Sequence, residues 1–324
     1  MKHDTNYPPG EMIYRHPIKM NLIRDLYALA QSWLNKAGFQ EVDPEKSLYQ
    51  YFNVRKKVFD WHPRVVLYSD VFWNTVPDGY KKVVERIASD VRIGRNLQRY
   101  MSTKTESARY NDDALNALGI YHFHLSIRQG KNPKFVKRNK YLILAVVSET
   151  SFYFIKIVKH NSNWQYDRNL YKIIYRNWPG VLSPYIYDGE LSIDGDMDDI
   201  EYKQLRDSHV TTAISLGNKI CFGIGFGVTS DGSSTQVIRT ADAMYNRCAL
   251  VQMIISRERD TIENIIRSLT SSNNLGVHHD ISIELINIWG NNFVLMDKKT
   301  RVIFAYNFKK QKFWWIGIDG VRLY

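Results

Sequence analysis

The residues from Gly119 to Ile127 alternate in character, and this pattern constrains the fold more than any other in the chain. Successive side chains of a β-strand point to opposite faces, so alternate residues share a face. His122, His124 and Ser126 would then lie on one face. The other face would carry Tyr121, Phe123, Leu125 and Ile127. The pattern therefore predicts a strand with two imidazoles on one side.

Two β-rich runs after this strand would place it within a sheet. Residues 141–147 and 151–158 are rich in β-branched and aromatic side chains. Ser148-Glu149-Thr150 lies between them, and this arrangement predicts a hairpin. His160 follows the second run directly, so an antiparallel arrangement would bring it towards the end of the His122/His124 strand.

The region before this strand, residues 1–110, is expected to be mainly helical. Apolar residues recur at helical spacing over about residues 21–37. A further helix is expected over about residues 80–101, with an interruption at Gly94. A short buried strand is expected at residues 65–68.

The last third of the chain predicts one long helix followed by short strands. Helical periodicity runs from about Thr240 to Leu269, and short β-like runs alternate with turns from Asp280 onward. The expected class is α+β: N-terminal helices packed on a mixed or antiparallel sheet, a long late helix and a C-terminal antiparallel β meander. The expected regions are 1–110, 111–272 and 273–324, the second of which carries the H-x-H strand.

Composition limits the functional classes without selecting one. Of the 324 residues 44% are hydrophobic, which is enough for a substantial core, and the net charge is +11. Such a surplus favours a polyanionic partner such as nucleic acid, although a basic surface alone would also explain it. Cys221 and Cys248 are too few for a disulfide framework. No apolar run approaches the roughly 20 residues of a membrane span, so a cytoplasmic protein is expected.

His122, His124 and His160 are the candidate catalytic residues. An imidazole can accept a proton and an imidazolium can donate one near neutral pH. Two histidines beside cationic side chains suit phosphodiester chemistry: one activates a 2′-hydroxyl, another protonates the leaving oxygen, and Arg or Lys stabilises the charged phosphorane. The alternative is that one histidine is a hydrogen-bonded core residue and the other is simply exposed.

Two further interpretations use the same histidines. The pair His122 and His124, with His160 or a carboxylate as third ligand, would also suit a metal ion, although we expect a site without metal. His124-Leu125-Ser126 and His209-Val210-Thr211 are two H-x-S/T units. Such units resemble the paired motifs of two-histidine phosphoesterases, which act on RNA ends and cyclic phosphates.

A basic segment follows the H-x-H strand and predicts contact with a phosphate backbone. Tyr100 and Tyr110 would be available to stack on bases. A solvated basic face is the alternative. The candidate nucleic-acid-binding residues are Arg128, Lys131, Lys134, Lys137, Arg138 and Lys140, together with Arg92, Arg95 and Arg99.

Two stretches of the chain resemble a set of uncharacterised bacterial proteins. Residues 119–125 read G-I-Y-H-F-H-L, and Asn177-Trp178-Pro179 follows further on. The resemblance is to bacterial proteins that carry a GI-x-HxHL stretch and a downstream NWP stretch, and it covers roughly residues 20–265. Some of these proteins look like accessory proteins of mobile elements or of anti-phage defence. The resemblance implies a defence or toxin-like role and assigns no catalytic residue.

Together these features predict a phosphodiester-processing protein, foremost a metal-independent ribonuclease or toxin-like nuclease of bacterial defence. The expected partner is nucleic acid, with RNA favoured over DNA, and no cofactor is expected. The competing hypothesis is a non-catalytic nucleic-acid-binding protein or a structural subunit of a defence assembly. In that case the C-terminal meander would be the surface that docks a protein partner.

Overall fold

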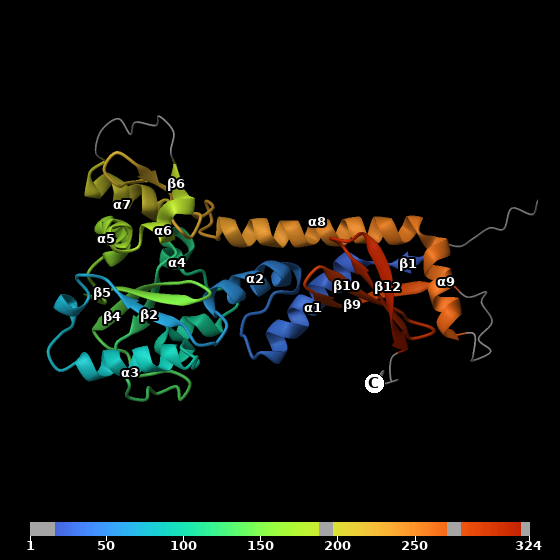
Figure 1. Cartoon of the computed structure of the whole chain (residues 1–324), viewed down its shortest axis with the longest axis horizontal. Helices are drawn as coiled ribbons and strands as arrows, with labels where there is room; N and C mark the ends of the chain where they lie inside the picture. The colour runs from blue at the N-terminus through green and yellow to red at the C-terminus, as the bar shows by residue number, and fades with distance from the viewer. Residues whose placement is uncertain (1–16, 188–196, 271–279, 319–324) are drawn as a thin grey trace, which may run out of the picture. The chain divides into compact units, whose positions relative to one another are not determined.

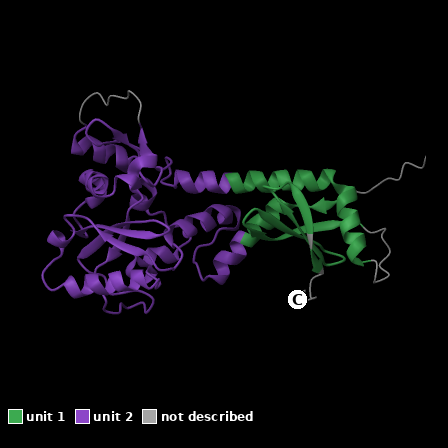
Figure 2. Cartoon of the chain, viewed as in Figure 1, with its two compact units in different colours: residues 1–29, 243–324 green, residues 30–242 purple. Residues whose placement is uncertain are grey.

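The chain forms two compact units, coloured separately in Figure 2. One unit comprises residues 30–242, and the other joins residues 1–29 to residues 243–324. We refer to them as the larger and the smaller unit. The computed structural model describes residues 17–187, 197–270 and 280–318.

A four-stranded sheet in the order β2-β5-β4-β3 forms the centre of the larger unit. β4 and β5 make the expected antiparallel hairpin, β3 pairs antiparallel with β4, and β2 pairs parallel with β5. The sheet is therefore mixed, and the strand with the H-x-H pattern lies at its edge. The strands are β2 (Val65–Tyr68), β3 (Tyr121–His124), β4 (Tyr141–Val147) and β5 (Ser151–Lys159).

Helices cover both faces of this sheet, as Figure 1 shows. Val84, Ile87 and Val91 of α3 (Lys81–Arg92) pack on one face together with Phe123. The other face is covered by α4 (Asp113–Leu118), α5 (Asn169–Asn177) and α6 (Pro179–Leu182). These layers confirm the α+β class.

The expected helix over residues 80–101 ends early because the chain must turn at Gly94. α3 stops at Arg92, and Gly94 has a φ of +70°. A Cβ atom at Gly94 would lie 2.6 Å from the carbonyl carbon of His62, so only glycine fits this close approach. A short 3₁₀ turn at Gln98–Tyr100 follows. The earlier helices are α1 (Leu22–Lys36) and α2 (Ser47–Lys57).

A second, three-stranded sheet in the larger unit has the order β6-β8-β7. After β8, the backbone of Gly225 passes so close to α4 that a Cβ there would lie 2.1 Å from the carbonyl oxygen of Asn116. The glycines of this loop therefore allow close packing between loop and helix. The elements are β6 (Ile186–Tyr187), α7 (Asp199–Asp207), β7 (Ile214–Ser215) and β8 (Ile220–Cys221).

The smaller unit contains the C-terminal meander, which confirms the expected antiparallel arrangement. β1 (Lys19–Met20) extends it by pairing parallel with its first strand, so the order is β1-β9-β10-β11-β12. The meander strands are β9 (Ser282–Trp289), β10 (Asn292–Asp297), β11 (Val302–Asn307) and β12 (Lys312–Ile318).

The long late helix is also confirmed, but it is shorter than expected. α8 (Thr235–Arg257) ends where Glu258 interrupts the helix, and α9 (Arg259–Thr270) then leaves in a new direction (Figure 1). The backbone N–H of Ile262 donates to the carbonyl oxygen of Glu258, and the Thr261 hydroxyl donates to the Glu258 carboxylate. Glu258 therefore marks the start of a new helix. The spacing of apolar residues is the same for a new helix as for a continued one, so the sequence does not reveal this break.

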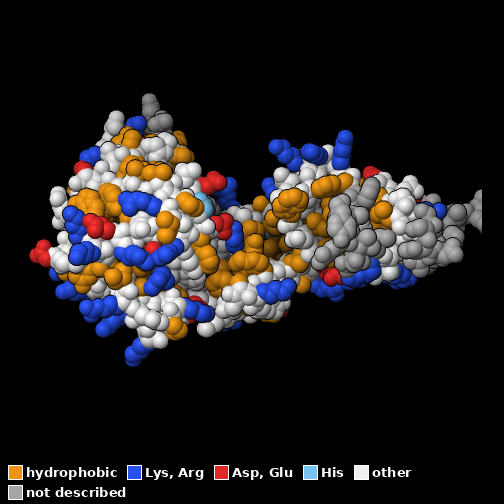
Figure 3. All heavy atoms as spheres, turned by 60° about the horizontal axis from the view of Figure 1, so that its bottom comes forward, with side chains coloured by type: hydrophobic (Ala, Val, Ile, Leu, Met, Phe, Trp, Pro, Cys, Tyr) orange, Lys and Arg blue, Asp and Glu red, His pale blue; other side chains and the backbone are white. Residues whose placement is uncertain are grey.

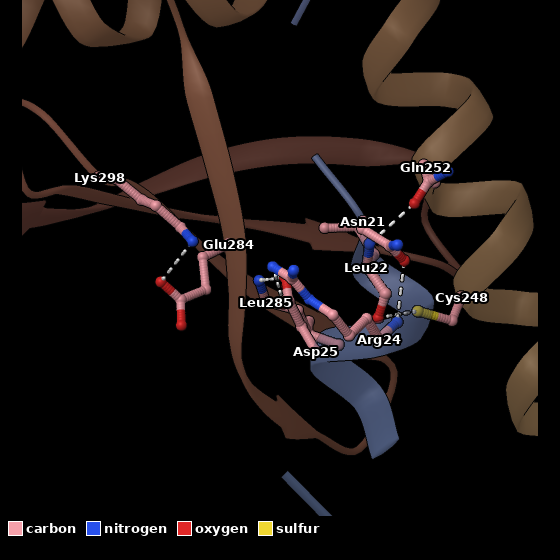
Figure 4. A network of polar contacts seen from close by, with 9 residues as sticks. All are labelled: Asn21, Leu22, Arg24, Asp25, Cys248, Gln252, Glu284, Leu285 and Lys298. Carbon is pink, nitrogen blue, oxygen red and sulfur yellow. Dashed lines mark hydrogen bonds and ion pairs between the residues drawn. The ribbon is translucent and has the colours of Figure 1, made fainter. Parts of the chain in front are cut away.

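Polar contacts tie the first turns of α1 to the rest of the smaller unit (Figure 4). The backbone N–H of Leu22 donates to Oε1 of Gln252 at 2.8 Å, and Sγ of Cys248 donates to the carbonyl oxygen of Leu22 at 3.3 Å. Asp25 is only 8% exposed, and its Oδ2 accepts from the backbone N–H of Leu285 at 3.1 Å. Burial raises the pKa of Asp25, and the Leu285 N–H opposes this rise.

These contacts explain why the compact units cross the boundaries expected from sequence. β1 and the start of α1 belong with the meander because they pair with β9 and contact α8. Such pairing between distant segments leaves no local trace in the sequence. None of the helices in the described residues is both long enough and apolar enough to cross a lipid bilayer.

Replacement of Asp25 should separate its hydrogen bond from its charge. Asp25→Ala leaves the buried Leu285 N–H without an acceptor and should lower the free energy of unfolding by about 1–3 kcal/mol. Asp25→Asn keeps an acceptor oxygen and should cost less at pH 7. A raised pKa means that the wild type loses stability as pH rises through that pKa, and Asn should remove this loss. Urea unfolding at several pH values measures both effects, and equal costs for the two variants would contradict this account.

Candidate functional site

His122 and His124 share one face of β3, as the alternation predicts. His122 lies opposite Leu144 of β4, and His124 lies opposite Leu142. Leu144 in turn lies opposite Lys156 of β5, so His122 and Lys156 belong to one row across the sheet. The strand ends at His124, and Ser126 therefore lies beyond it.

Asp112 lies beside His122. Oδ2 of Asp112 is 3.7 Å from Nδ1 of His122, and the two side chains are 6% and 17% exposed. Oδ1 of Asp112 accepts from the backbone N–H of Leu115 at 3.1 Å and so caps the N-terminus of α4. The ring of Trp164 packs against His122, with ring centroids 5.5 Å apart. At this distance the two atoms make no hydrogen bond, but the negative charge of the carboxylate can stabilise a protonated imidazole.

His160 is brought to His124 by the pairing of β4 with β5. The backbone N–H of His160 donates to the carbonyl oxygen of Lys140 at 2.8 Å. The rings of His124 and His160 stack at a centroid distance of 5.8 Å and an interplanar angle of 11°. His160 is exposed, whereas His124 is buried. The three histidines therefore form a row that begins on the edge strand β3 with His122 and His124 and continues to His160, just beyond the end of β5.

Burial controls the protonation of His124. It lowers the pKa of His124 to about 4, and electrostatic interactions with His122, His160 and Arg138 lower it further. His124 is therefore neutral at pH 7. Its Nδ1 is buried and has no hydrogen-bond partner among the described residues.

The described part of the chain holds no group of three His, Cys, Asp or Glu side chains arranged to bind a metal ion.

The two H-x-S/T units lie in different kinds of backbone structure. His209 follows α7 in a turn with a φ of +58°, and the Thr211 hydroxyl accepts from the backbone N–H of Val228 at 3.2 Å. Thr211 therefore lies outside the strands and contacts the backbone of Val228.

The predicted basic residues divide into separate groups. Arg128, Lys137 and Arg138 line a hollow of about 440 Å³ together with Tyr80 and Asn139. We call this the basic hollow. Figure 3 shows Lys and Arg side chains interspersed with apolar ones over the larger unit.

The remaining predicted cations are dispersed, and several have partners. Lys134 pairs with Glu106 at 2.9 Å, and Arg95 pairs with Asp90 at 3.2 Å. Arg99 lines a hollow of about 310 Å³ that also includes Lys134, and Nζ of Lys140 lies over the ring of Tyr141. Lys131 is exposed, and Arg92 lines another hollow.

The two predicted stacking residues are placed differently from each other. Tyr100 is 1% exposed and its hydroxyl donates to Asp90 at 2.6 Å, so its ring cannot receive a base. The ring of Tyr110 is half-buried beneath Nζ of Lys57 and Nζ of Lys104, at 5.4 and 5.7 Å.

Sequence reasoning missed Asp112 and the two lysines at the end of α2. Nζ of Lys57 donates to the carbonyl oxygens of Ser107 and Tyr110, and Nζ of Lys56 donates to Gly225 and Ser234. Burial lowers the pKa of each lysine to about 8, and the charge of Asp112 opposes this fall. Asp112 could have been recognised from the sequence, because it lies at the N-cap of a short helix just before the strand that carries the histidines.

A comparison of the chain with models of protein families, with curated proteins and with solved structures found no match. The resemblance to bacterial proteins with GI-x-HxHL and NWP stretches therefore stays a prediction.

The low pKa of His124 should make folding sensitive to acid. Unfolding restores an ordinary histidine pKa near 6.5, so the unfolded chain binds a proton first as pH falls from 6.5 towards 4. This proton uptake should cost the wild type roughly 2 kcal/mol of unfolding free energy between pH 7 and pH 5. His124→Phe keeps a ring against His160 and should remove the fall in unfolding free energy that comes from protonation of His124. Urea unfolding at both pH values tests this, with the half-buried residue His62 replaced by Phe as the control outside the row.

Proposed function

We propose that this chain cleaves phosphodiester bonds of RNA without a metal ion, through the row formed by His122, His124 and His160. The observation that carries the proposal is the meeting of three histidines with a carboxylate. The rings of His124 and His160 stack at a centroid distance of 5.8 Å, and Asp112 lies 3.7 Å from His122.

The chemistry needs one proton acceptor and one proton donor. A base removes the proton of the 2′-hydroxyl, and the 2′-oxygen forms a bond to phosphorus. The bond from phosphorus to the 5′-oxygen then breaks, and an acid donates a proton to that oxygen. The products are a 2′,3′-cyclic phosphate and a free 5′-hydroxyl. Imidazoles perform both transfers near neutral pH.

The surroundings of each histidine support different roles. His122 would be the base, because Asp112 can stabilise the imidazolium that forms after proton transfer. His160 is exposed and would be the acid that reaches the leaving oxygen. His124, neutral at pH 7, would position the His160 ring by stacking. Arg138 would stabilise the negative charge of the phosphorane.

Removal of either proton-transfer group should reduce cleavage strongly. His122→Ala and His160→Ala should each lower the cleavage rate of a single-stranded RNA by about 10²–10⁴-fold, the usual contribution of general acid–base catalysis. Asp112→Asn should have a smaller effect, because it removes the stabilising charge and keeps the imidazole. The measurement is the rate of appearance of 2′,3′-cyclic phosphate ends in the presence of a metal chelator.

His62→Ala is the matched control, because His62 is a half-buried histidine of the same unit, like His122, and lies outside the row. The control should cleave at the wild-type rate. Wild-type rates for both His122→Ala and His160→Ala would contradict the catalytic assignment, as would a wild type that leaves RNA intact.

A second candidate function is nucleic-acid binding without cleavage. The observation that favours it is the basic hollow, where Arg128, Lys137 and Arg138 lie together. Such a protein needs the cations and not the histidines.

The two functions differ in their dependence on salt and on histidine. The logarithm of the affinity for a single strand falls linearly with the logarithm of the salt concentration. Each phosphate contact adds about 0.7 to the steepness of that fall. Lys137→Ala should therefore weaken RNA binding and reduce that slope by about 0.7. Lys36→Ala removes an exposed charge outside the hollow and should change neither quantity. Anisotropy titrations at several salt concentrations measure both, and an unchanged slope for Lys137→Ala would contradict a phosphate contact.

The biological setting forms part of the proposal. The resemblance of residues 119–125 to bacterial GI-x-HxHL proteins supports a toxin-like nuclease in cytoplasmic anti-phage defence. In such a setting the meander of the smaller unit would dock a protein partner, and Trp289, at 71% exposed, would be available on it.

A further inference from the structure

A groove beside α3 combines an exposed aromatic ring with cationic side chains. It has a volume of about 730 Å³, and Tyr68, Trp73, Lys81 and Arg92 are among its lining residues. Trp73 is 41% exposed. We call this the Trp73 groove. It differs from the histidine row, because Tyr68 packs with the α3 face of the sheet and the row lies on the other face.

Two neighbouring aromatic rings, those of Phe72 and Tyr68, hold the exposed ring of Trp73 in place. The ring of Phe72, which is fully buried, meets it edge-on at 5.5 Å and 89°. The ring of Tyr68 lies 5.0 Å from it at 42° and itself stacks on Phe154. A ring fixed in this way loses little conformational freedom when a planar ligand stacks on it.

The charge of the Trp73 groove taken together with the adjoining basic hollow favours an anionic ligand. Lys81 and Arg92 are both exposed, and the Arg92 side chain forms a hydrogen bond with the Tyr68 hydroxyl. Gly79 lines both the Trp73 groove and the basic hollow, so the two adjoin. The combined lining holds five cations against the carboxylates of Asp78 and Glu85. The cations are Lys81, Arg92, Arg128, Lys137 and Arg138.

We propose that the Trp73 groove binds single-stranded RNA by stacking one unpaired base on Trp73, while the neighbouring phosphates contact Arg92 and the adjoining basic hollow. The identity of the ligand rests on the proposed function; the site itself is additional to it. A ring beside a track of cations is the arrangement that single-strand-binding proteins use, since every base offers a π-face. Bases within a duplex have both faces covered by their neighbours, so the groove selects single strands.

The test uses a fluorescent 2′-O-methyl oligouridylate, which lacks the attacking hydroxyl and stays intact whatever the catalytic outcome. Binding to the full chain is measured by anisotropy. Trp73→Ala should weaken binding by about 5- to 100-fold, the range for loss of one base–aromatic stack. Trp73→Phe keeps an aromatic face and should lose less. Trp61→Ala, which removes a tryptophan 56% exposed that does not line the groove, should bind as the wild type does.

Three results would overturn the inference: wild-type affinity in Trp73→Ala, equal losses in Trp73→Ala and Trp61→Ala, or equally strong competition by a duplex of the same length. Circular dichroism shows whether each variant is folded, and Trp73→Phe keeps the test decisive if Trp73→Ala unfolds. Failure of the proposed cleavage would leave the anisotropy result unchanged. Conversely, cleavage that depends on His122 without binding that depends on Trp73 would contradict only this inference.

Discussion

Burial of β4 on both faces is the constraint on which the larger unit depends. Residues 142–146 are each at most 4% exposed, which is unusual for five consecutive residues of an antiparallel strand. Burial of each large apolar side chain contributes about 1.5–3 kcal/mol. This contribution requires helices on both faces of the sheet and strands on both sides of β4. The positions of α3, α4 and α5, and of β3 at the edge, follow from that requirement.

The same constraint determines the chemistry of the histidine row. Because α4 and α5 cover the face that carries His122 and His124, His124 loses water and its pKa falls to about 4. His160 follows β5 at the end of the sheet and remains exposed. The three histidines of the row therefore differ in their access to water. We propose that, as a result, His122 acts as the base, His124 as the positioning group and His160 as the acid.

Asp112 connects the helical layer to this row. One oxygen caps α4 and the other faces His122, so the fold of the helix positions the carboxylate. The nearby lysines of α2 are bonded to backbone carbonyls, which fits a structural role in joining α2 to the neighbouring loops. The basic hollow and the Trp73 groove lie on the face of the sheet that α3 covers. We propose that they bind the RNA strand.

Local patterns in the sequence determined several elements of this protein. Alternation predicted β3 and the shared face of His122 and His124, and the β-rich runs predicted the β4–β5 hairpin and the meander, because these signals depend on neighbouring residues alone. Only the tertiary structure decided which distant groups meet. It placed Asp112 beside His122 and β1 on β9, and it buried Tyr100 while leaving Trp73 exposed. These outcomes depend on burial and on pairing between remote segments, and a side chain's own type does not reveal how much water the fold will leave around it.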